Sequence, residues 1–125
     1  MNLNIDIATK YKLIVIFFLM LSSLICNYAW YAHLHEKHDN KPIMYLIITS
    51  WLIIFFEYLL VIPANRIGKF KAKLTLNQLY ILSEIMLILT FIPFSIYYFN
   101  NKISKKFIIS VVLVVIAGYI IRNDK

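Results

Sequence analysis

Four long apolar runs constrain this chain more than any other feature of its sequence. They cover residues 13–34, 43–62, 76–99 and 107–121, and short polar segments separate them. A helix needs roughly 20 residues to cross a hydrocarbon core about 30 Å thick. The first three runs reach that length, and the fourth is near its lower limit. The pattern therefore predicts four membrane-spanning helices.

The composition agrees with this interpretation. Of the 125 residues, 62% are hydrophobic and 15% are charged, against roughly 45–50% and 25% in a typical soluble domain. A soluble domain of this size has too much surface to hide so many apolar side chains from water. We therefore predict one all-α domain over residues 1–125, an integral membrane bundle of four transmembrane helices whose main partner is the lipid bilayer.

The basic residues flank the apolar runs, where they can reach lipid headgroups. The formal charge of +7 therefore does not indicate nucleic-acid binding. Four spans place both termini on one side of the membrane. That side holds eight basic residues: Lys10, Lys12, Arg66, Lys69, Lys71, Lys73, Arg122 and Lys125. The other side holds five: Lys37, Lys41, Lys102, Lys105 and Lys106. This small excess favours cytoplasmic termini.

Two carboxylates, Glu57 and Glu84, lie inside apolar runs. An acidic side chain at membrane depth costs a few kcal/mol on insertion scales, and such residues generally face the bundle interior or a wet cavity. Glu57 lies about 9 Å from the Pro63 end of its run, and Glu84 about 12 Å from the Leu76 end of the next. We expect these two runs to be antiparallel neighbours, with both carboxylates at one level facing a common cavity.

Other polar residues follow the same helical faces, because residues seven apart share a face. Asn77 aligns with Glu84, with Tyr80 one turn away, and Asn27 lies on a polar face of the first run. Trp51 is six residues from Glu57 and is a candidate for lining the same cavity, since aromatic faces beside acids hold organic cations. These residues form a candidate substrate and proton site, and packing alone is the other interpretation of each.

Two nearby acids in a low dielectric cannot easily both ionise. One shared proton, exchanged for a cation, is the chemistry of a proton-coupled transporter. The alternative is that each carboxyl group is neutral or hydrogen-bonded and fixes helix packing.

Residues near the ends of the runs indicate contacts with the membrane interface. Trp30 and Tyr31 are typical of the aromatic belt, and Arg66 is placed to meet headgroup phosphate. A salt bridge from Arg66 to Glu57 would require a helix that continues past Pro63.

Nothing in the sequence predicts catalysis or a cofactor. There is no glycine-rich phosphate loop, no catalytic triad spacing and no paired cysteine motif. Three histidines, His33, His35 and His38, could ligate a metal. Because they lie in a short polar connection, solvated side chains are the favoured interpretation, and we predict neither an enzyme nor a metal site.

Four sequence segments are similar to those of a known family: Ala29–Leu34, Ser50–Tyr58, Pro63–Gly68 and Leu76–Glu84. They resemble the short uncharacterised four-helix branch of the drug/metabolite transporter (DMT) superfamily. The resemblance implies four transmembrane helices, kinship with small multidrug resistance proteins, and a homodimer. The chain departs from those proteins in its first run, which has no glutamate, and in its last, whose small residues are Ser110, Ala117 and Gly118.

Taken together, these features lead us to expect a small DMT-type transporter in the inner (cell) membrane of a bacterium. It would export a small cationic or amphipathic solute by proton coupling. The alternative is a membrane assembly or interaction subunit that transports nothing and uses the same polar faces for helix contacts.

Overall fold

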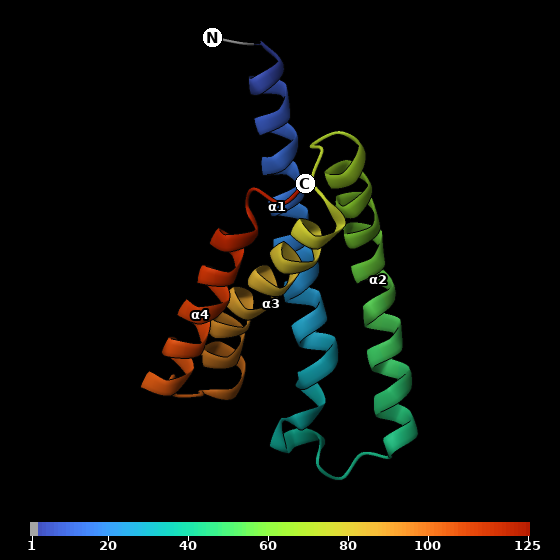
Figure 1. Ribbon diagram of the computed structural model, residues 1–125. Coiled ribbons are helices and arrows are strands. Elements are labelled where there is room, and N and C mark those ends of the chain that lie inside the picture. Colours follow the sequence, from blue (N-terminus) through green and yellow to red (C-terminus); the bar gives the residue numbers. More distant parts are fainter. Residues whose placement is uncertain (1–2) are drawn as a thin grey trace.

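The computed structural model describes residues 3–125, with side chains from Asp6 onward, and this part of the chain is helical without strands (Figure 1). The long helices are α1 (Leu3–Tyr31), α2 (Ile43–Phe70), α3 (Leu76–Phe99) and α4 (Lys105–Ile121). Two short 3₁₀ helices, η1 (Ala32–Leu34) and η2 (Glu36–His38), follow α1. The predicted all-α fold with four helices is confirmed.

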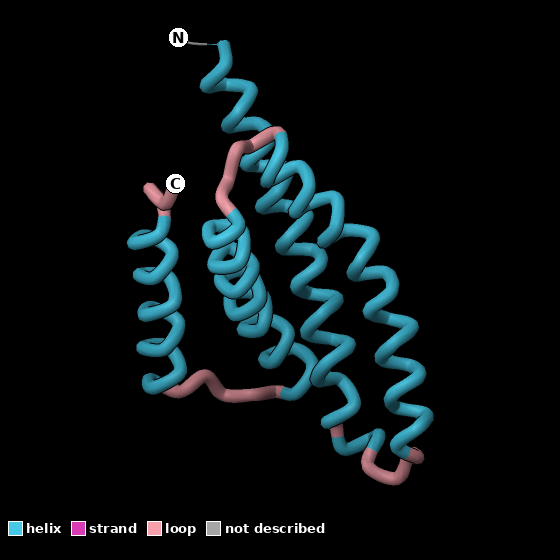
Figure 2. The backbone as a smooth tube through the Cα atoms, turned by 45° about the vertical axis from the view of Figure 1, so that its right-hand side comes forward, coloured by secondary structure: helices cyan, strands magenta, loops and turns pink. Residues whose placement is uncertain are grey.

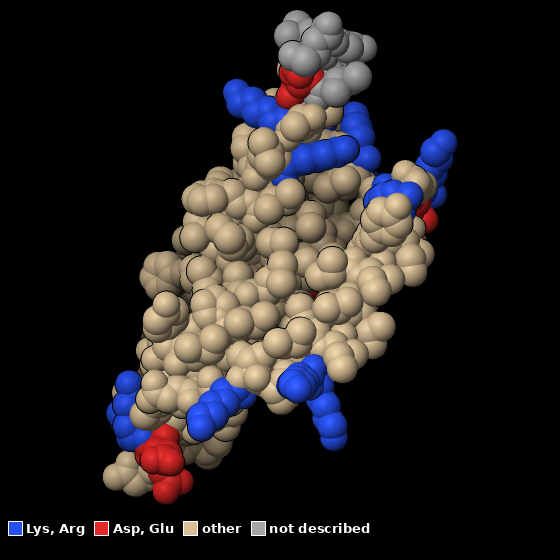
Figure 3. All heavy atoms as spheres, turned by 90° about the vertical axis from the view of Figure 1, so that its left-hand side faces the viewer, with Lys and Arg blue, Asp and Glu red and all other residues tan. Residues whose placement is uncertain are grey.

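Three of the helices are long and apolar enough to cross a membrane: α1 with η1, α2 and α3. The fourth helix, α4, has 17 residues and a length of about 25 Å, so it is shorter than the others. Figure 3 shows Lys and Arg side chains toward the two ends of the molecule and, between them, a broad band almost without charged side chains. Large apolar side chains remain exposed in this band, such as Trp51 at 66% and Leu113 at 61%. Lipid is the solvent that suits such a surface.

Several helix ends differ from the sequence-based expectation. α1 begins at Leu3, ahead of the expected start at residue 13. Lys10 and Lys12 lie in this additional segment, where a helix can continue out of the membrane. α4 begins at Lys105, where the Ser104 hydroxyl accepts a hydrogen bond from the Phe107 backbone N–H at 3.1 Å.

The largest difference is at the end of α2, which continues through Pro63 to Phe70 instead of ending near Ile62. Proline removes one backbone hydrogen bond, but membrane helices tolerate this loss. Beyond the proline, Ala64 and Gly68 are both buried, so packing holds the extra two turns against the bundle.

The order of the helices across the bundle is α2, α1, α3, α4 (Figure 2). α1 packs on both α2 and α3, whereas α2 and α3 make few contacts with each other, and α4 packs mainly on α3. The expectation that the second and third helices are direct neighbours along their length is therefore wrong. A short connection, residues 71–75, joins them at one end, but α1 occupies the space between them (Figures 1 and 2).

Small residues allow α1 and α2 to approach closely. Ala64 on α2 is fully buried in a core cluster with Val15, Leu19 and Leu79. A Cβ atom built on Gly68 would lie 2.5 Å from Leu79 Cδ2 and 3.6 Å from Val15 Cγ1. Residues four apart with small side chains are a common contact in membrane helices. This contact brings α1, α2 and α3 together near one end of the bundle.

The C-terminal residues are fixed to the start of α3. Thr75 and Gln78 form a capping box at that helix end. The Gln78 Nε2 also donates to the carbonyl oxygens of Ile121 at 3.2 Å and Arg122 at 2.8 Å. This arrangement holds the last turn of α4 beside the first turn of α3.

Candidate functional site

Glu57 lies on the face of α2 that packs against the bundle. It is 8% exposed and shares this face with Ala64 and Gly68, which follow it by seven and eleven residues. Among the described residues, its carboxylate has no hydrogen bond within 3.5 Å and no ion pair. A buried polar group normally has such a partner, and the buried Asn27, Ser22 and Thr90 each have one.

The register of α1 against α2 shows what lies opposite Glu57. Gly68 is next to Val15, and Ser50 lines a hollow with Ala29. In this antiparallel pair, Glu57 is therefore level with about residues 23–24 of α1, next to the buried Ser22 and Ser23. The Ser22 hydroxyl donates to the Leu19 carbonyl oxygen at 3.0 Å. Glu57 thus lies close to the level of a short polar stretch of α1.

Glu84 has a different environment. It is exposed and lines a groove of about 320 Å³ between α1, α3 and α4. The other lining residues are Asn27, Tyr31, Leu87, Ile88, Phe91 and Phe107. The ring of Phe91 meets Tyr31 edge-on at 5.6 Å between centroids and lies 5.9 Å from the ring of Phe107. One wall of the groove is therefore aromatic and carries a single carboxylate.

Asn27 connects the groove to the bundle core. It is 1% exposed, and its Nδ2 donates to the Leu87 carbonyl oxygen at 3.1 Å and to Thr90 Oγ1 at 3.0 Å. These bonds fix the register of α1 against α3. Asn27 therefore has a clear structural role at the edge of the Glu84 groove.

Glu57 and Glu84 do not line one common cavity. Glu57 faces α1 from the α2 side, while Glu84 lies in the groove on the α3 side. α1 packs on both α2 and α3, whereas α2 and α3 make few contacts with each other. The two acids are therefore separated by α1 and not by open space between α2 and α3.

The remaining candidate residues lie outside both environments. Trp51 is 66% exposed and Tyr80 65% exposed. Tyr80 lines a hollow with Arg66 near the end of α2. Asn77 is exposed at the start of α3, where its Nδ2 donates to Asp124 Oδ2 at 3.1 Å. The structure thus places Asn27 with Glu84, and places Trp51, Tyr80 and Asn77 elsewhere.

The residues expected at the interface are also separated. α2 does continue past Pro63, but the guanidinium of Arg66 lies over the Phe70 ring at 4.9 Å, and the described residues contain no ion pair between it and Glu57. Trp30 is half exposed and lines a hollow with His33. Tyr31 is half-buried and belongs to the aromatic wall of the groove.

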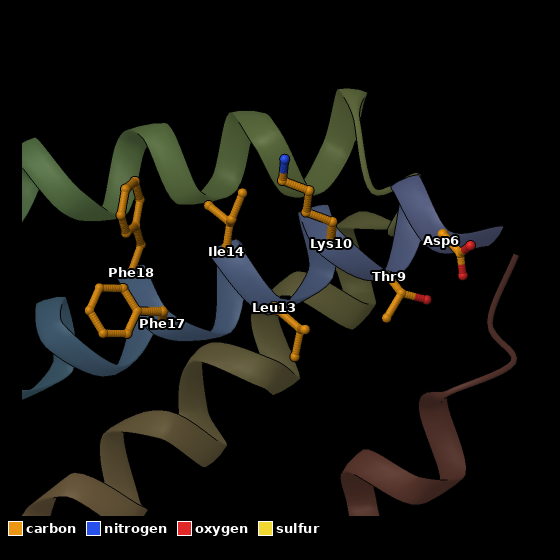
Figure 4. Close-up of a pocket in the computed structure, with 7 residues that line it drawn as sticks. All are labelled: Asp6, Thr9, Lys10, Leu13, Ile14, Phe17 and Phe18. Carbon is orange, nitrogen blue, oxygen red and sulfur yellow. The ribbon is translucent and has the colours of Figure 1, made fainter. Parts of the chain in front are cut away.

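A further hollow, of about 590 Å³, follows the first half of α1 (Figure 4). In this view Ile14 and Phe18 point toward α2, and Leu13 points away from it. Its polar residues, Asp6, Thr9 and Lys10, lie at one end only. A hollow with apolar walls and polar groups at its mouth offers no buried group to select a solute, and lipid can fill it.

The three histidines do not form a metal site in the described chain. The His38 Nε2 lies 3.5 Å from the Tyr98 hydroxyl, and the His35 ring packs edge-on against Tyr98 at 5.1 Å. The Lys37 ammonium lies over the same Tyr98 ring at 4.8 Å. The connection between α1 and α2 is therefore held against the end of α3 by aromatic and cationic contacts.

Acid should loosen this connection through His38. Desolvation, together with Lys41, Lys37, His35 and His33, lowers the pKa of His38 below its usual value. A lowered pKa means that the folded state prefers the neutral ring. The stabilisation of the connection by neutral His38 is therefore complete above about pH 6.5. It is lost as pH falls below that value. We expect hydrogen exchange of residues 32–41, corrected for the intrinsic rate, to speed up between pH 7.5 and 5.

The matched control for this prediction is His33, which is half-buried in the same connection. His38→Gln should flatten the pH dependence, whereas His33→Gln, which removes only the smallest of the contributions that lower the pKa of His38, should retain most of it. An unchanged pH dependence in His38→Gln would show that another group controls the connection.

Sequence reasoning missed four residues of the groove: Leu87, Ile88 and the aromatic residues Phe91 and Phe107. Phe91 follows Glu84 by seven residues, so the periodicity that aligned Asn77 with Glu84 also indicates Phe91. No spacing argument reaches Phe107, because it lies on another helix and its position depends on how α4 packs on α3.

The helical architecture, the apolar band and the membrane-depth carboxylates define a small helical integral membrane protein. The chain belongs to a family described as "Putative member of DMT superfamily (DUF486)", whose family model matches residues 15–122. Comparisons with curated proteins and with solved structures found no significant match. The family match confirms the resemblance to the DMT superfamily and supports a transporter-like role.

Proposed function

We propose that this protein is a small proton-coupled transporter that exports a small cationic or amphipathic solute. The observation that carries the proposal is Glu57, a carboxylate buried at membrane depth without a hydrogen-bond partner among the described residues. In this proposal Glu57 takes up and releases the proton, and the Glu84 groove binds the solute.

A comparison with Asn27 supports a functional role for Glu57. Asn27 is a buried polar residue with a packing role, and both hydrogens of its amide are used in hydrogen bonds to α3. Glu57 makes no such bond, although burying it costs a few kcal/mol. A residue retained only for packing would be expected to recover part of that cost by bonding as Asn27 does. A carboxyl group that must gain and lose a proton has a reason to stay unbonded.

The chemistry of the groove supports the proposed class of solute. Glu84 supplies a negative charge, and Tyr31, Phe91 and Phe107 supply aromatic rings. Aromatic faces attract cations by about 0.5–2 kcal/mol each, more strongly when water is excluded. The volume of about 320 Å³ is at the small end of ligand sites. A small organic cation with an apolar part suits these walls.

A homodimer in a bacterial inner membrane, with cytoplasmic termini, completes the proposal. The groove is open on one side, and only a small share of α2 is buried within the chain. A second copy would enclose a path that four helices alone leave open. The superfamily consists of transporters, which is consistent with this arrangement.

Thermal unfolding in detergent tests the proposed solute class. Ethidium and tetramethylammonium are the first probes, at pH 6 and pH 8. If binding of a cation in the Glu84 groove is coupled to release of the Glu57 proton, the probe should raise the unfolding temperature more at pH 8. At 100 times its dissociation constant a ligand stabilises a protein by about 2.7 kcal/mol, which gives a measurable shift of several degrees.

Glu84→Gln should remove this shift, and Glu36→Gln, the same change at an exposed position, should retain it. The proposed site is contradicted if Glu84→Gln responds as the wild type does. The proposed class is contradicted if a panel of aromatic and quaternary ammonium cations produces no shift.

A further inference from the structure

A second groove, on the side of the bundle where both termini lie, combines an apolar floor with a basic rim. It has a volume of about 460 Å³ and is formed by α1, α3 and α4. Its apolar residues include Ile16, Ile81, Leu82, Ile85 and Val115. Its rim holds two cations, Lys12 and Arg122, together with Gln78. None of these residues belongs to the Glu84 groove.

The rim of this groove lies at the level of the membrane interface. Lys12 directly precedes the first apolar run, and Arg122 directly follows α4. Gln78 is in the first turn of α3. From this level the groove extends along seven residues of α3, to Ile85, and seven of α4, to Val115. Seven helical residues correspond to about 10 Å, so the apolar floor reaches into the hydrocarbon layer while the cations stay at its surface.

The groove exists because α4 is held mainly by α3 and leaves a gap beside α1. Gly118 forms part of the floor, where a Cβ atom would overlap Ile85 Cδ1. Lys12 and Ile16 of α1 line one side of the groove, and Val115, Gly118 and Tyr119 of α4 line another. The two cations therefore come from opposite walls of one groove.

Arg122 keeps donors for a ligand. Its guanidinium lies 3.7 Å from the centroid of the Tyr119 ring, and its Nη1 donates to the Tyr119 carbonyl oxygen at 2.6 Å. This uses one of its five N–H groups. The nearby Asp124 carboxylate accepts bonds from Thr75 Oγ1 and Asn77 Nδ2, and the described residues contain no ion pair between it and Arg122. The rim is therefore positively charged.

We propose that this groove binds an anionic phospholipid, with the headgroup phosphate between Lys12 and Arg122 and an acyl chain along the apolar floor. Charge complementarity selects the headgroup, and the depth of the floor selects a ligand with a hydrocarbon chain. The lipid bridges α1 and α4, which otherwise have little direct contact. This inference does not depend on transport or on either glutamate.

Native mass spectrometry of the full chain released from detergent tests the proposal. Phosphatidylglycerol is compared with phosphatidylcholine of the same acyl chains, and with inorganic phosphate. We expect phosphatidylglycerol to remain bound where phosphatidylcholine is lost. Two basic residues near a membrane surface contribute roughly 30-fold in affinity, so Lys12→Gln/Arg122→Gln should weaken phosphatidylglycerol binding by about that factor.

Two further variants separate charge from shape. Lys105→Gln/Lys106→Gln removes two charges at the opposite end of α4 and should bind as the wild type does. Val115→Trp fills the groove from an exposed position, since Val115 is 45% exposed, and should also weaken binding while all charges remain. Equal binding of the two lipids, full binding by Lys12→Gln/Arg122→Gln, or displacement of the lipid by millimolar inorganic phosphate would each overturn the proposal.

Discussion

Replacing Glu57 by glutamine should abolish proton-coupled movement of cations in proteoliposomes while the four helices remain folded. Glutamine has nearly the same shape as glutamate but cannot release a proton at any pH near neutrality. The buried position on α2 would therefore stay filled, and only the proton exchange would be lost. The measurement is the alkalinisation of an acid-loaded vesicle, reported by an internal pH-sensitive dye, when ethidium is added outside. We expect the rate to fall to that of protein-free vesicles.

The control is Glu36→Gln, in η2 and exposed to solvent, which should transport at the wild-type rate. Circular dichroism of both variants checks that the helices are intact. A normal rate in Glu57→Gln would contradict the proposed mechanism. If the wild type itself moves no cation and Glu57→Gln changes only unfolding temperature or recovery of a complex, the assembly-subunit interpretation is favoured.

Gly68→Leu should destabilise the bundle by about 3 kcal/mol or more. A Cβ atom at this position already comes within 2.5 Å of Leu79 Cδ2 and 3.6 Å of Val15 Cγ1, so a larger side chain must push α2 away from both neighbours. Overpacking of a tight contact typically costs 1–3 kcal/mol, and the lost burial of Ala64 adds to this. The measurement is equilibrium unfolding in mixed micelles, followed by circular dichroism.

Gly68→Ala is the matched comparison. The closest atom, Leu79 Cδ2, is the end of a flexible side chain, and alanine favours a helix by about 1 kcal/mol over glycine. The close contact with Leu79 and the higher helix propensity of alanine oppose each other, so we expect the free energy of unfolding to change by less than about 1 kcal/mol. If Gly68→Leu were as stable as Gly68→Ala, α2 would not be packed against α1 in the way described.

Much of the fold follows from hydropathy, because a bilayer requires each span to be long, apolar and internally hydrogen-bonded. The bounds of α3 agree with the expected range of 76–99. The end of α2 does not, because a proline that indicates the end of a soluble helix is tolerated inside a membrane helix. Ala64 and Gly68 carried the missing information, since small residues four apart indicate a helix contact.

The candidate site was harder to predict because helical periodicity identifies faces but not which faces meet. Glu57 and Glu84 both lie inside spans, as the sequence indicated. Their expected common cavity depended on α2 and α3 being neighbours, and chain order alone does not decide that. The bonds of Asn27 to α3 show why α1 takes the intermediate place. In that place its buried amide can donate hydrogen bonds to the Leu87 carbonyl oxygen and to Thr90 Oγ1.

The central place of α1 bears on how the chain is assembled during synthesis. α1 is synthesised before α2 and α3, and both of them dock on it, so each of these spans meets a surface that is already in the bilayer. α4 follows α3 in the chain and docks on it. Contacts between segments close in sequence form quickly, and this topology lets the bundle grow in the order in which the ribosome delivers it.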